Sequence, residues 1–359
     1  MAIYDSNGNE IGGIITDEQV RLAFMNALAD GTIVIGGIVG NTLGIDTHNF
    51  NSGYVDTAYA SLLSAYKAHP NSVPFFMQTD EHGRGMEIQR YANNIDIDGV
   101  EFANLNGGDS VVDTYSATAL EDVYDRIEYV KNYIGTPGNH DYKPPSGETV
   151  SEFEIRKAFC TTNLERRMIC TSDLDSFVAY MPIHTVKFLC LDFYNPSGII
   201  SGMPHPYVDT ATATWMIEEL SRDDGNDIVI FTHEPTWVTY KGRDDENYTS
   251  ASSVASRYYL YLARKNKTSG TFTDDEGVTH SYDFTSCKTN LLCAISGHNH
   301  AEQYSDKDGL TVYAGDWCGA NKFGGVFGLI DRDSDLLRIF RFDSVSGVLN
   351  ELDISLQFN

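Results

Sequence analysis

Basic residues are scarce in this sequence of 359 residues. Lysine and arginine number 25 against 51 aspartates and glutamates, so the formal net charge at pH 7 is −26. A field of that sign repels polyanions and offers no basic footprint for a nucleic acid. The charge therefore argues against long DNA or RNA as a partner, although a site that holds cations could still accept a small phosphate.

Closely spaced cysteine pairs and long apolar runs are also missing, and no signal peptide is expected. The six cysteines show no CxxC spacing, which indicates neither a disulfide framework nor a thiolate zinc site, and Cys190 and Cys293 lie in apolar runs that predict burial. No run of about 18 apolar residues occurs, so we expect no membrane span. The first residues lack the basic and apolar regions of a signal peptide. A cytoplasmic location is the default expectation, and an extracellular or virion-associated location stays open.

Apolar residues, in contrast, are plentiful at 42% of the chain, with 12% aromatics. Short apolar runs alternate with amphipathic stretches, which is the α/β pattern, and ligands in such folds bind beyond the carboxyl ends of the strands. The predicted strands are 73–78, 100–105, 177–181, 186–191, 227–231, 291–295 and a hairpin of 326–330 with 336–342. The predicted helices are 55–68, 117–133, 152–159, 211–220 and 253–264.

The beginning of the chain differs from the rest. An Asn7-Gly8 pair predicts a hairpin turn, residues 16–29 have helical character, and residues 31–53 are rich in glycine. No chemistry is evident there. We therefore predict two parts, an N-terminal extension at 1–52 that could serve in assembly and a catalytic domain at 53–359. Homo-oligomer formation through the extension stays open.

Five short polar clusters stand out, four of them directly after an apolar run. They are Asp80-x-His82, Gly108-Asp109, Gly138-Asn139-His140-Asp141, His233 and Gly297-His298-x-His300. In a DxH or HxH sequence at the end of a strand, both side chains lie on the same side. Nitrogen and oxygen donors without thiolate suit Mn, Fe, Zn and similar ions. One ion takes only about four to six ligands, so seven donors predict two ions that share a bridging carboxylate.

This order of motifs, DxH, GD, GNHD, a lone His and GHxH, resembles the calcineurin-like metallophosphoesterase family over roughly residues 70–345. The resemblance implies an α/β sandwich of two mixed β-sheets flanked by helices, here with an N-terminal extension. It implies a hydrolase that acts on small phosphomonoesters or phosphodiesters through a hydroxide bridging two divalent ions. Those ions would be Mn, Fe, Zn or Ni, with Mn favoured. Matched residue by residue, the first ion would be held by Asp80, His82 and His300, the second by Asn139, His233 and His298, and Asp109 would bridge both.

The residues around the phosphate follow from the same resemblance. His140 would face the phosphate beside Asn139 and give a proton to the leaving oxygen as general acid. Arg84 is a candidate phosphate contact, with a surface salt bridge as the alternative. Family members often carry GDxxD or GDxxH, whose last residue positions the catalytic histidine. Here Val112 occupies that position, so either Asp113, one residue later, orients His140 or no residue does, and a tyrosine-ligated purple iron site is not expected.

The sequence also offers three alternative interpretations. A nuclease of the same fold should show a basic groove, and a phage or cell-surface structural or binding protein could retain the metal site unused. Asp331, Asp333 and Asp335 hint at a calcium loop, but Leu336 stands where such a loop needs glycine, so a hairpin turn is the better interpretation. Asp141 is expected to hold the turn or a backbone amide rather than a ligand.

Overall fold

The computed structural model describes most of the predicted catalytic domain. It covers residues 52–78, 102–110, 132–142, 169–170, 176–181, 184–191, 193–200, 203–235, 253–298, 300, 302–306, 309–315, 324–343 and 349–356. The predicted extension up to residue 51 and the predicted helix at 152–159 lie outside these ranges. The division into two domains therefore stays a prediction.

The first of two large sheets has six strands in the order β17–β16–β15–β1–β2–β3. Its strands are β1 (Val73–Gln78), β2 (Ala103–Asn106), β3 (Tyr133–Gly135), β15 (Gly324–Asp331), β16 (Leu336–Asp343) and β17 (Leu349–Ser355). Strands β1, β2 and β3 run parallel, whereas β15, β16 and β17 are joined by antiparallel pairing, so the sheet is mixed. All six residues of β1 are buried, because both faces of this sheet are covered.

The second large sheet has seven strands in the order β13–β14–β12–β9–β6–β5–β4. Its strands are β4 (Ile169–Cys170), β5 (Ser176–Met181), β6 (Val186–Leu191), β9 (Asp227–Thr232), β12 (Leu291–Ser296), β13 (Gln303–Ser305) and β14 (Thr311–Ala314). The central strands β6, β9, β12 and β14 are parallel, and the outer ones pair antiparallel. This sheet is therefore mixed as well.

Helices and two small ribbons complete the described part. They are α2 (Ser52–Ala68), the 3-10 turn η2 (Asn139–Tyr142), α6 (Thr210–Ser221), α7 (Ser253–Lys265) and the paired strands β7 (Tyr194–Ile200) with β8 (Met203–Pro206) and β10 (Ser269–Thr273) with β11 (Thr279–Asp283). Asp209 begins α6 as its N-cap, with its carboxylate accepting from Thr212 N at 2.7 Å. No helix in the described ranges is long and apolar enough to cross a bilayer.

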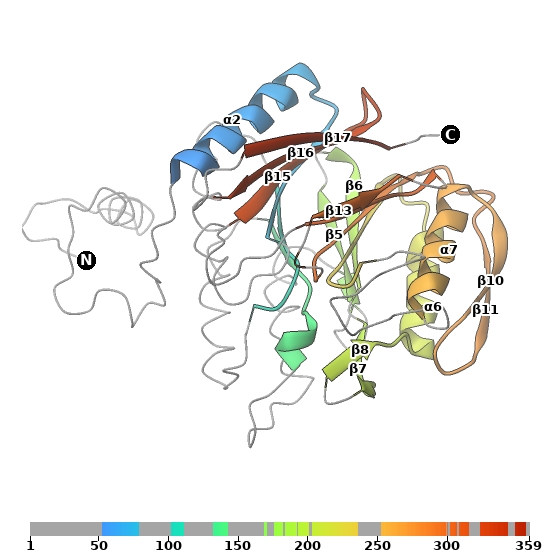
Figure 1. The fold of residues 1–359 in the computed structure, drawn as a ribbon. Coiled ribbons are helices and arrows are strands. Elements are labelled where there is room, and N and C mark those ends of the chain that lie inside the picture. Colours follow the sequence, from blue (N-terminus) through green and yellow to red (C-terminus); the bar gives the residue numbers. More distant parts are fainter. Residues whose placement is uncertain are drawn as a thin grey trace, which may run out of the picture. The chain divides into compact units, whose positions relative to one another are not determined.

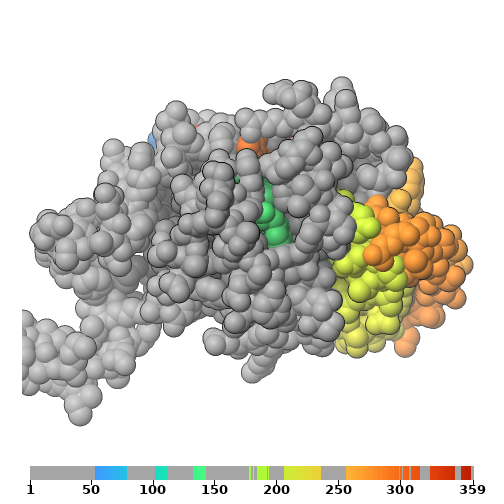
Figure 2. Space-filling view, turned by 90° about the horizontal axis from the view of Figure 1, so that it is seen from below, coloured from blue at the N-terminus to red at the C-terminus, as the bar shows by residue number. Residues whose placement is uncertain are grey.

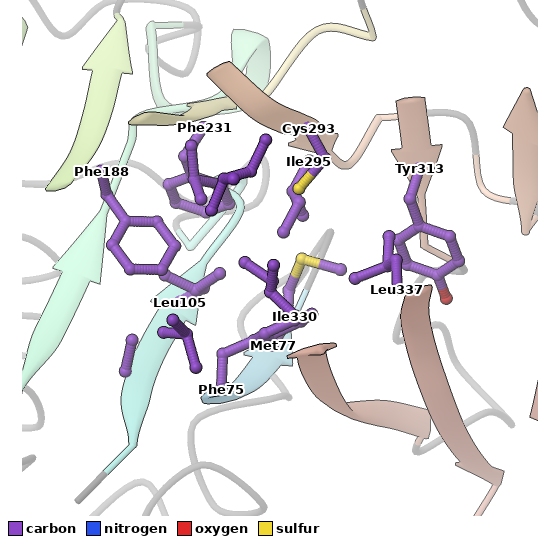
Figure 3. Packing of buried hydrophobic residues seen from close by; sticks show 14 of the residues in the cluster. Phe75, Met77, Leu105, Phe188, Phe231, Cys293, Ile295, Tyr313, Ile330 and Leu337 are labelled. Atoms are coloured by element: carbon purple, nitrogen blue, oxygen red, sulfur yellow. The ribbon is translucent and has the colours of Figure 1, made fainter. Parts of the chain in front are cut away.

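The main core lies between the two large sheets. Figure 3 shows side chains from both sheets packed against one another. Phe75, Met77, Leu105, Ile330 and Leu337 come from the first sheet, and Phe188, Phe231, Cys293, Ile295 and Tyr313 come from the second. Burying each such side chain stabilises the fold by roughly 1.5–3 kcal/mol. This core holds the sheets face to face.

Helices cover the outer faces of both sheets (Figure 1). Val55 and Leu62 of α2 pack with Phe327 and Phe342 on the outside of the first sheet. Helices α6 and α7 pack with Leu189, Ile230 and other apolar residues on the outside of the second sheet. The protein is thus an α/β sandwich of two mixed sheets flanked by helices, which confirms the predicted fold class.

Several predicted boundaries need correction. The second strand begins at Ala103 rather than at residue 100 and continues to Asn106. The helix predicted at 117–133 cannot extend to its last residue, because Tyr133 begins strand β3. The ribbon of β10 and β11 was not predicted, whereas the hairpin of β15 and β16 was, and Asp331 pairs with Leu336 across its turn.

A buried lysine links α7 to the end of the first sheet. Lys265 is 7% exposed, and its Nζ donates to the carbonyl of Leu356, after β17, at 2.8 Å and to that of Leu292, in β12, at 3.5 Å. Burial lowers the pKa of Lys265 from 10.5 to about 8. The folded state therefore binds fewer protons than the unfolded chain between those two values, so this residue makes the free energy of unfolding rise with pH across that window.

Replacing this lysine should remove that pH dependence. Between pH 7.5 and about 10.5, Lys265 should raise the free energy of unfolding of the wild type by roughly 3 kcal/mol, at about 1.4 kcal/mol per pKa unit. We expect Lys265→Met to lack this rise when both proteins are unfolded with urea across that pH range. Lys67→Met, on the exposed side of α2, is the control and should parallel the wild type. Parallel curves for Lys265→Met would contradict the expectation.

Candidate metal and phosphoester site

The carboxyl ends of parallel strands from both sheets meet at one place. In the first sheet, Asp109 follows the end of β2 and Asn139 follows the end of β3. In the second sheet, His233 follows the end of β9 and His298 follows the end of β12. The side chain of His233 lies within hydrogen-bonding distance of Asn139 and of the backbone of Gly107. The site therefore spans the seam between the two sheets.

The structure brings together part of the predicted ligand set. Four side chains, from Asp109, Asn139, His233 and His298, converge at the seam. His140 lies on the same turn as Asn139, and His300 follows β12 and is half-buried. The remaining predicted site residues, Asp80, His82, Arg84 and Asp113, lie outside the described ranges.

Three of the donor atoms form a nearly equilateral triangle. Asn139 Oδ1 lies 3.1 Å from His233 Nε2 and 3.1 Å from His298 Nδ1, and the two ring nitrogens are 3.0 Å apart. Asp109 Oδ2 is 3.7 Å from His233 Nε2, and both of these side chains are 1% exposed. Three polar atoms from three separate segments thus lie about 3 Å from one another, and the Asp109 carboxylate lies beside one of them.

The second nitrogen of each ring fixes which nitrogen faces that point. His233 Nδ1 donates to the carbonyl of Gly107, which leaves a lone pair on Nε2. His298 Nε2 lies 3.4 Å from the carboxylate Oε1 of Glu234, and a carboxylate at that side favours the proton on Nε2 and hence the lone pair on Nδ1. Both imidazoles therefore direct lone pairs towards Asn139 Oδ1, because their N–H groups are directed elsewhere.

This donor set fits a divalent cation. Lone pairs about 3 Å apart repel one another unless a positive charge lies between them, and that spacing is what adjacent ligands adopt around an ion bound at roughly 2.0–2.2 Å. Histidines that bind metals usually donate their other N–H to a backbone carbonyl or a carboxylate. His233 and His298 have such partners in Gly107 and Glu234. Imidazole, amide and carboxylate donors suit Mn, Fe, Zn or Ni.

A buried carboxylate joins the two loops of the first sheet. Asp141 Oδ2 accepts from the backbone N–H of Asp109 at 2.8 Å and from that of Gly138 at 2.7 Å. Asp109 Oδ1 in turn accepts from the backbone N–H of His140 at 2.8 Å. Asp141 is thus the structural residue that was expected, and it also fixes the backbone that carries Asp109.

Two glycines allow these loops to approach each other. A Cβ on Gly138 would lie 2.2 Å from Asp109 Oδ1 and 2.7 Å from the ring of His233. A Cβ on Gly108, whose φ is +95°, would lie 2.5 Å from Gly138 N. No larger residue fits at either position without moving backbone, which explains the glycine in both the GD and the GNHD motifs.

Candidate donors also occupy an unusual backbone region. Asp109, His298 and His300 have φ values of 56°, 68° and 52°. Residues other than glycine rarely adopt this left-handed backbone conformation, which costs roughly 1–3 kcal/mol per residue. Such residues cluster at functional sites. The hydrogen bonds and packing of the loops hold these residues in place against that cost.

The turn that carries His140 is accessible. Asn139 is buried, whereas His140 and Tyr142 are half-exposed. Figure 2 shows atoms of the green segment that contains η2 on the face seen from below. A side chain at this position can contact a molecule that arrives from solvent.

Two contributors to the site were not predicted from the sequence. Glu234 is 2% exposed and faces His298 across 3.4 Å, and the Gly107 carbonyl accepts from His233. Both lie next to a predicted motif, but a role as partner of a histidine depends on contacts between distant segments. Adjacency to His233 is the only sequence signal for Glu234.

A second group of His and Asp residues lies at the opposite end of β1. His69, Asp331 and Asp333 are close enough together to hold one ion. However, Asp331 already accepts from Arg338 Nε at 2.9 Å and from the backbone N–H groups of Asp333 and Ser334 at 3.1 Å. The carboxylate is therefore neutralised by a guanidinium and holds the β15–β16 turn, as a hairpin turn requires.

Sequence similarity identifies no family for this chain. No protein-family model matches the chain, and no curated protein matches it. A solved structure of a conserved uncharacterized protein from Streptococcus pneumoniae TIGR4, described as a predicted phosphoesterase, aligns with 79% of this chain and 98% of its own at 10% identity and a TM-score of 0.33.

Removing the Asp141 carboxylate should destabilise the protein. Asp141→Ala leaves two buried N–H groups without their acceptor, at about 1–3 kcal/mol each, so we expect a loss of roughly 2–5 kcal/mol in urea unfolding. Asp141→Asn keeps a side-chain oxygen and should lose less. Asp283→Ala removes an exposed carboxylate that accepts from Thr285 N and Oγ1, and should cost under about 1 kcal/mol. Equal losses in both alanine variants would contradict the role of Asp141.

Proposed function

We propose that this protein is a dinuclear-metal-dependent phosphoester hydrolase that acts on small phosphomonoesters or phosphodiesters. The observation that carries the proposal is the convergence of Asp109, Asn139, His233 and His298 where the strand ends of the two sheets meet. Asn139 Oδ1, His233 Nε2 and His298 Nδ1 lie 3.0–3.1 Å from one another, and the groups beside the second nitrogens of both imidazoles favour this orientation of the rings.

In this proposal three of the described side chains hold one ion, and the fourth, Asp109, is shared with a second ion. Asn139, His233 and His298 would hold one cation, Asp80, His82 and His300 would hold the other, and Asp109 would be shared between them. Bound together, two divalent ions would acidify a water and stabilise the charge of an in-line displacement at phosphorus. The proposed ions are Mn, Fe, Zn or Ni, with Mn favoured.

The proton for the leaving group comes from His140 in the proposal. Its backbone N–H is tied to Asp109 Oδ1 at 2.8 Å, so the imidazole begins beside the bridging carboxylate. Its side chain is half-exposed, as contact with a substrate requires. Asn139 and Arg84 are the proposed contacts for the phosphate, and Asp113 is the proposed group that orients His140.

The substrate class follows from charge. The formal net charge of −26 opposes binding of a long polyanion, whereas a small ester needs only the local positive charge of the cations. We therefore propose small phosphoesters rather than nucleic acids. A strongly salt-sensitive affinity for duplex DNA would support a nuclease instead.

The proposal is tested with Asp109→Asn, which keeps the shape of the carboxylate but loses its charge. Metal-replete protein should hydrolyse p-nitrophenyl phosphate or bis-p-nitrophenyl phosphate, a chelator should abolish the activity, and the variant should lose at least about 100-fold in kcat/KM. The control Asp283→Asn, at an exposed turn, should keep wild-type activity. Absence of turnover in metal-replete wild type would refute the proposed function.

The role of His140 is tested by the choice of leaving group. In His140→Ala we expect hydrolysis of alkyl phosphoesters to fall by roughly 100-fold or more, because alkoxides need a proton to leave. Hydrolysis of p-nitrophenyl esters should fall far less, because nitrophenolate is a stable anion. Equal losses in kcat for both leaving groups would assign His140 to phosphate binding rather than to proton donation.

A further inference from the structure

A carboxylate outside the predicted donor set is buried beside the site. Glu234 follows His233 directly in the chain, is 2% exposed, and its Oε1 lies 3.4 Å from His298 Nε2. Taking a carboxylate out of water is costly unless a charged or hydrogen-bonding partner compensates. The imidazole of His298 is such a partner.

The backbone around Glu234 aims its side chain. The hydroxyl of Thr232, at the end of β9, donates to the carbonyl of Glu234. Pro235 follows and excludes the helical region for the residue before it. The carbonyl of His233 accepts from Gly297 N at 2.9 Å, which ties the loop after β9 to the loop after β12. The carboxylate therefore approaches His298 from a fixed backbone.

We propose that Glu234 is a positioning residue that orients His298 for a divalent cation. It takes the Nε2–H of the imidazole, which holds Nδ1 towards Asn139 Oδ1, 3.1 Å away, and towards His233 Nε2, 3.0 Å away. Its negative charge also favours a cation at the Nδ1 side of the ring. This inference rests on the proposed function, because it requires that the donor set binds metal.

The adjacent residues His233 and Glu234 would act on two different metal-binding nitrogens. His233 supplies a ring nitrogen itself, and Glu234 fixes the ring nitrogen of His298 on the neighbouring parallel strand β12. The geometry of the cation site on the second sheet then depends on His233-Glu234 as a unit. Loss of Glu234 should loosen His298 without removing any donor atom.

The test is metal binding rather than activity. Mn²⁺ binding to Glu234→Ala and Glu234→Gln is measured by calorimetry, and the Co²⁺ forms are compared by visible absorption. We expect His298→Ala to abolish one Mn²⁺-binding step. Glu234→Ala should weaken that same step by about 10–100-fold and should alter the Co²⁺ spectrum. Glu234→Gln, which keeps an acceptor for Nε2–H, should weaken it less. Glu219→Gln, a buried glutamate on α6 that is paired with Arg222, is the control and should bind as the wild type does.

A double-mutant cycle separates positioning from general stabilisation. If Glu234 acts through His298, Glu234→Ala should have no further effect on Mn²⁺ affinity in the His298→Ala background. Wild-type affinity and spectrum in Glu234→Ala, or an undiminished effect in that background, would overturn the inference while the proposed function stands. Failure of the wild type to bind either ion would overturn both. If Glu234→Ala does not fold, the same comparison with Glu234→Gln decides.

Discussion

The site depends on one buried carboxylate and the two backbone amides that it binds. Asp141 Oδ2 accepts from Asp109 N and Gly138 N, and so joins the loop after β2 to the loop after β3. Because Gly138 has no side chain, the joined loops can also contact the ring of His233 from the other sheet. The left-handed backbone of Asp109, at φ 56°, is held by the same bond. The position of Asp109 therefore follows from a neighbouring carboxylate that hydrogen-bonds to the backbone of both loops.

The two sheets contribute unequal kinds of support. On the first sheet the two loops are held by the backbone N–H groups of Asp109, Gly138 and His140, which donate to the carboxylates of Asp141 and Asp109. On the second sheet the donors are held by side-chain contacts of the imidazoles, since His233 binds the Gly107 carbonyl and His298 faces Glu234. The apolar core between the sheets sets the distance at which these two halves meet. Site geometry is thus a product of core packing.

Much of the fold could be predicted because its central strands are buried on both faces. Strands β1 and β6 appear in the sequence as unbroken apolar runs, and their observed bounds equal the predicted ones. The β10–β11 ribbon is mostly exposed and rich in threonine and serine, so no apolar run marks it. Strand β3 has three residues and was merged with the helix expected before it. Within the site, motif order placed Asn139, His233 and His298 at strand ends. It could not pair His298 with Glu234, because these two residues are 64 positions apart in the chain and meet only after β9 and β12 have paired in the sheet.

The wide separation of the donors along the chain has a consequence for synthesis. Asn139 and His298 are 159 residues apart, and His298 follows β12, a central strand of the second sheet. A nascent chain that has not yet produced β12 holds Asp109 and Asn139 but lacks the last nitrogen donor of the triangle. These side chains can therefore come together only after β12 has been synthesised and has paired with β9.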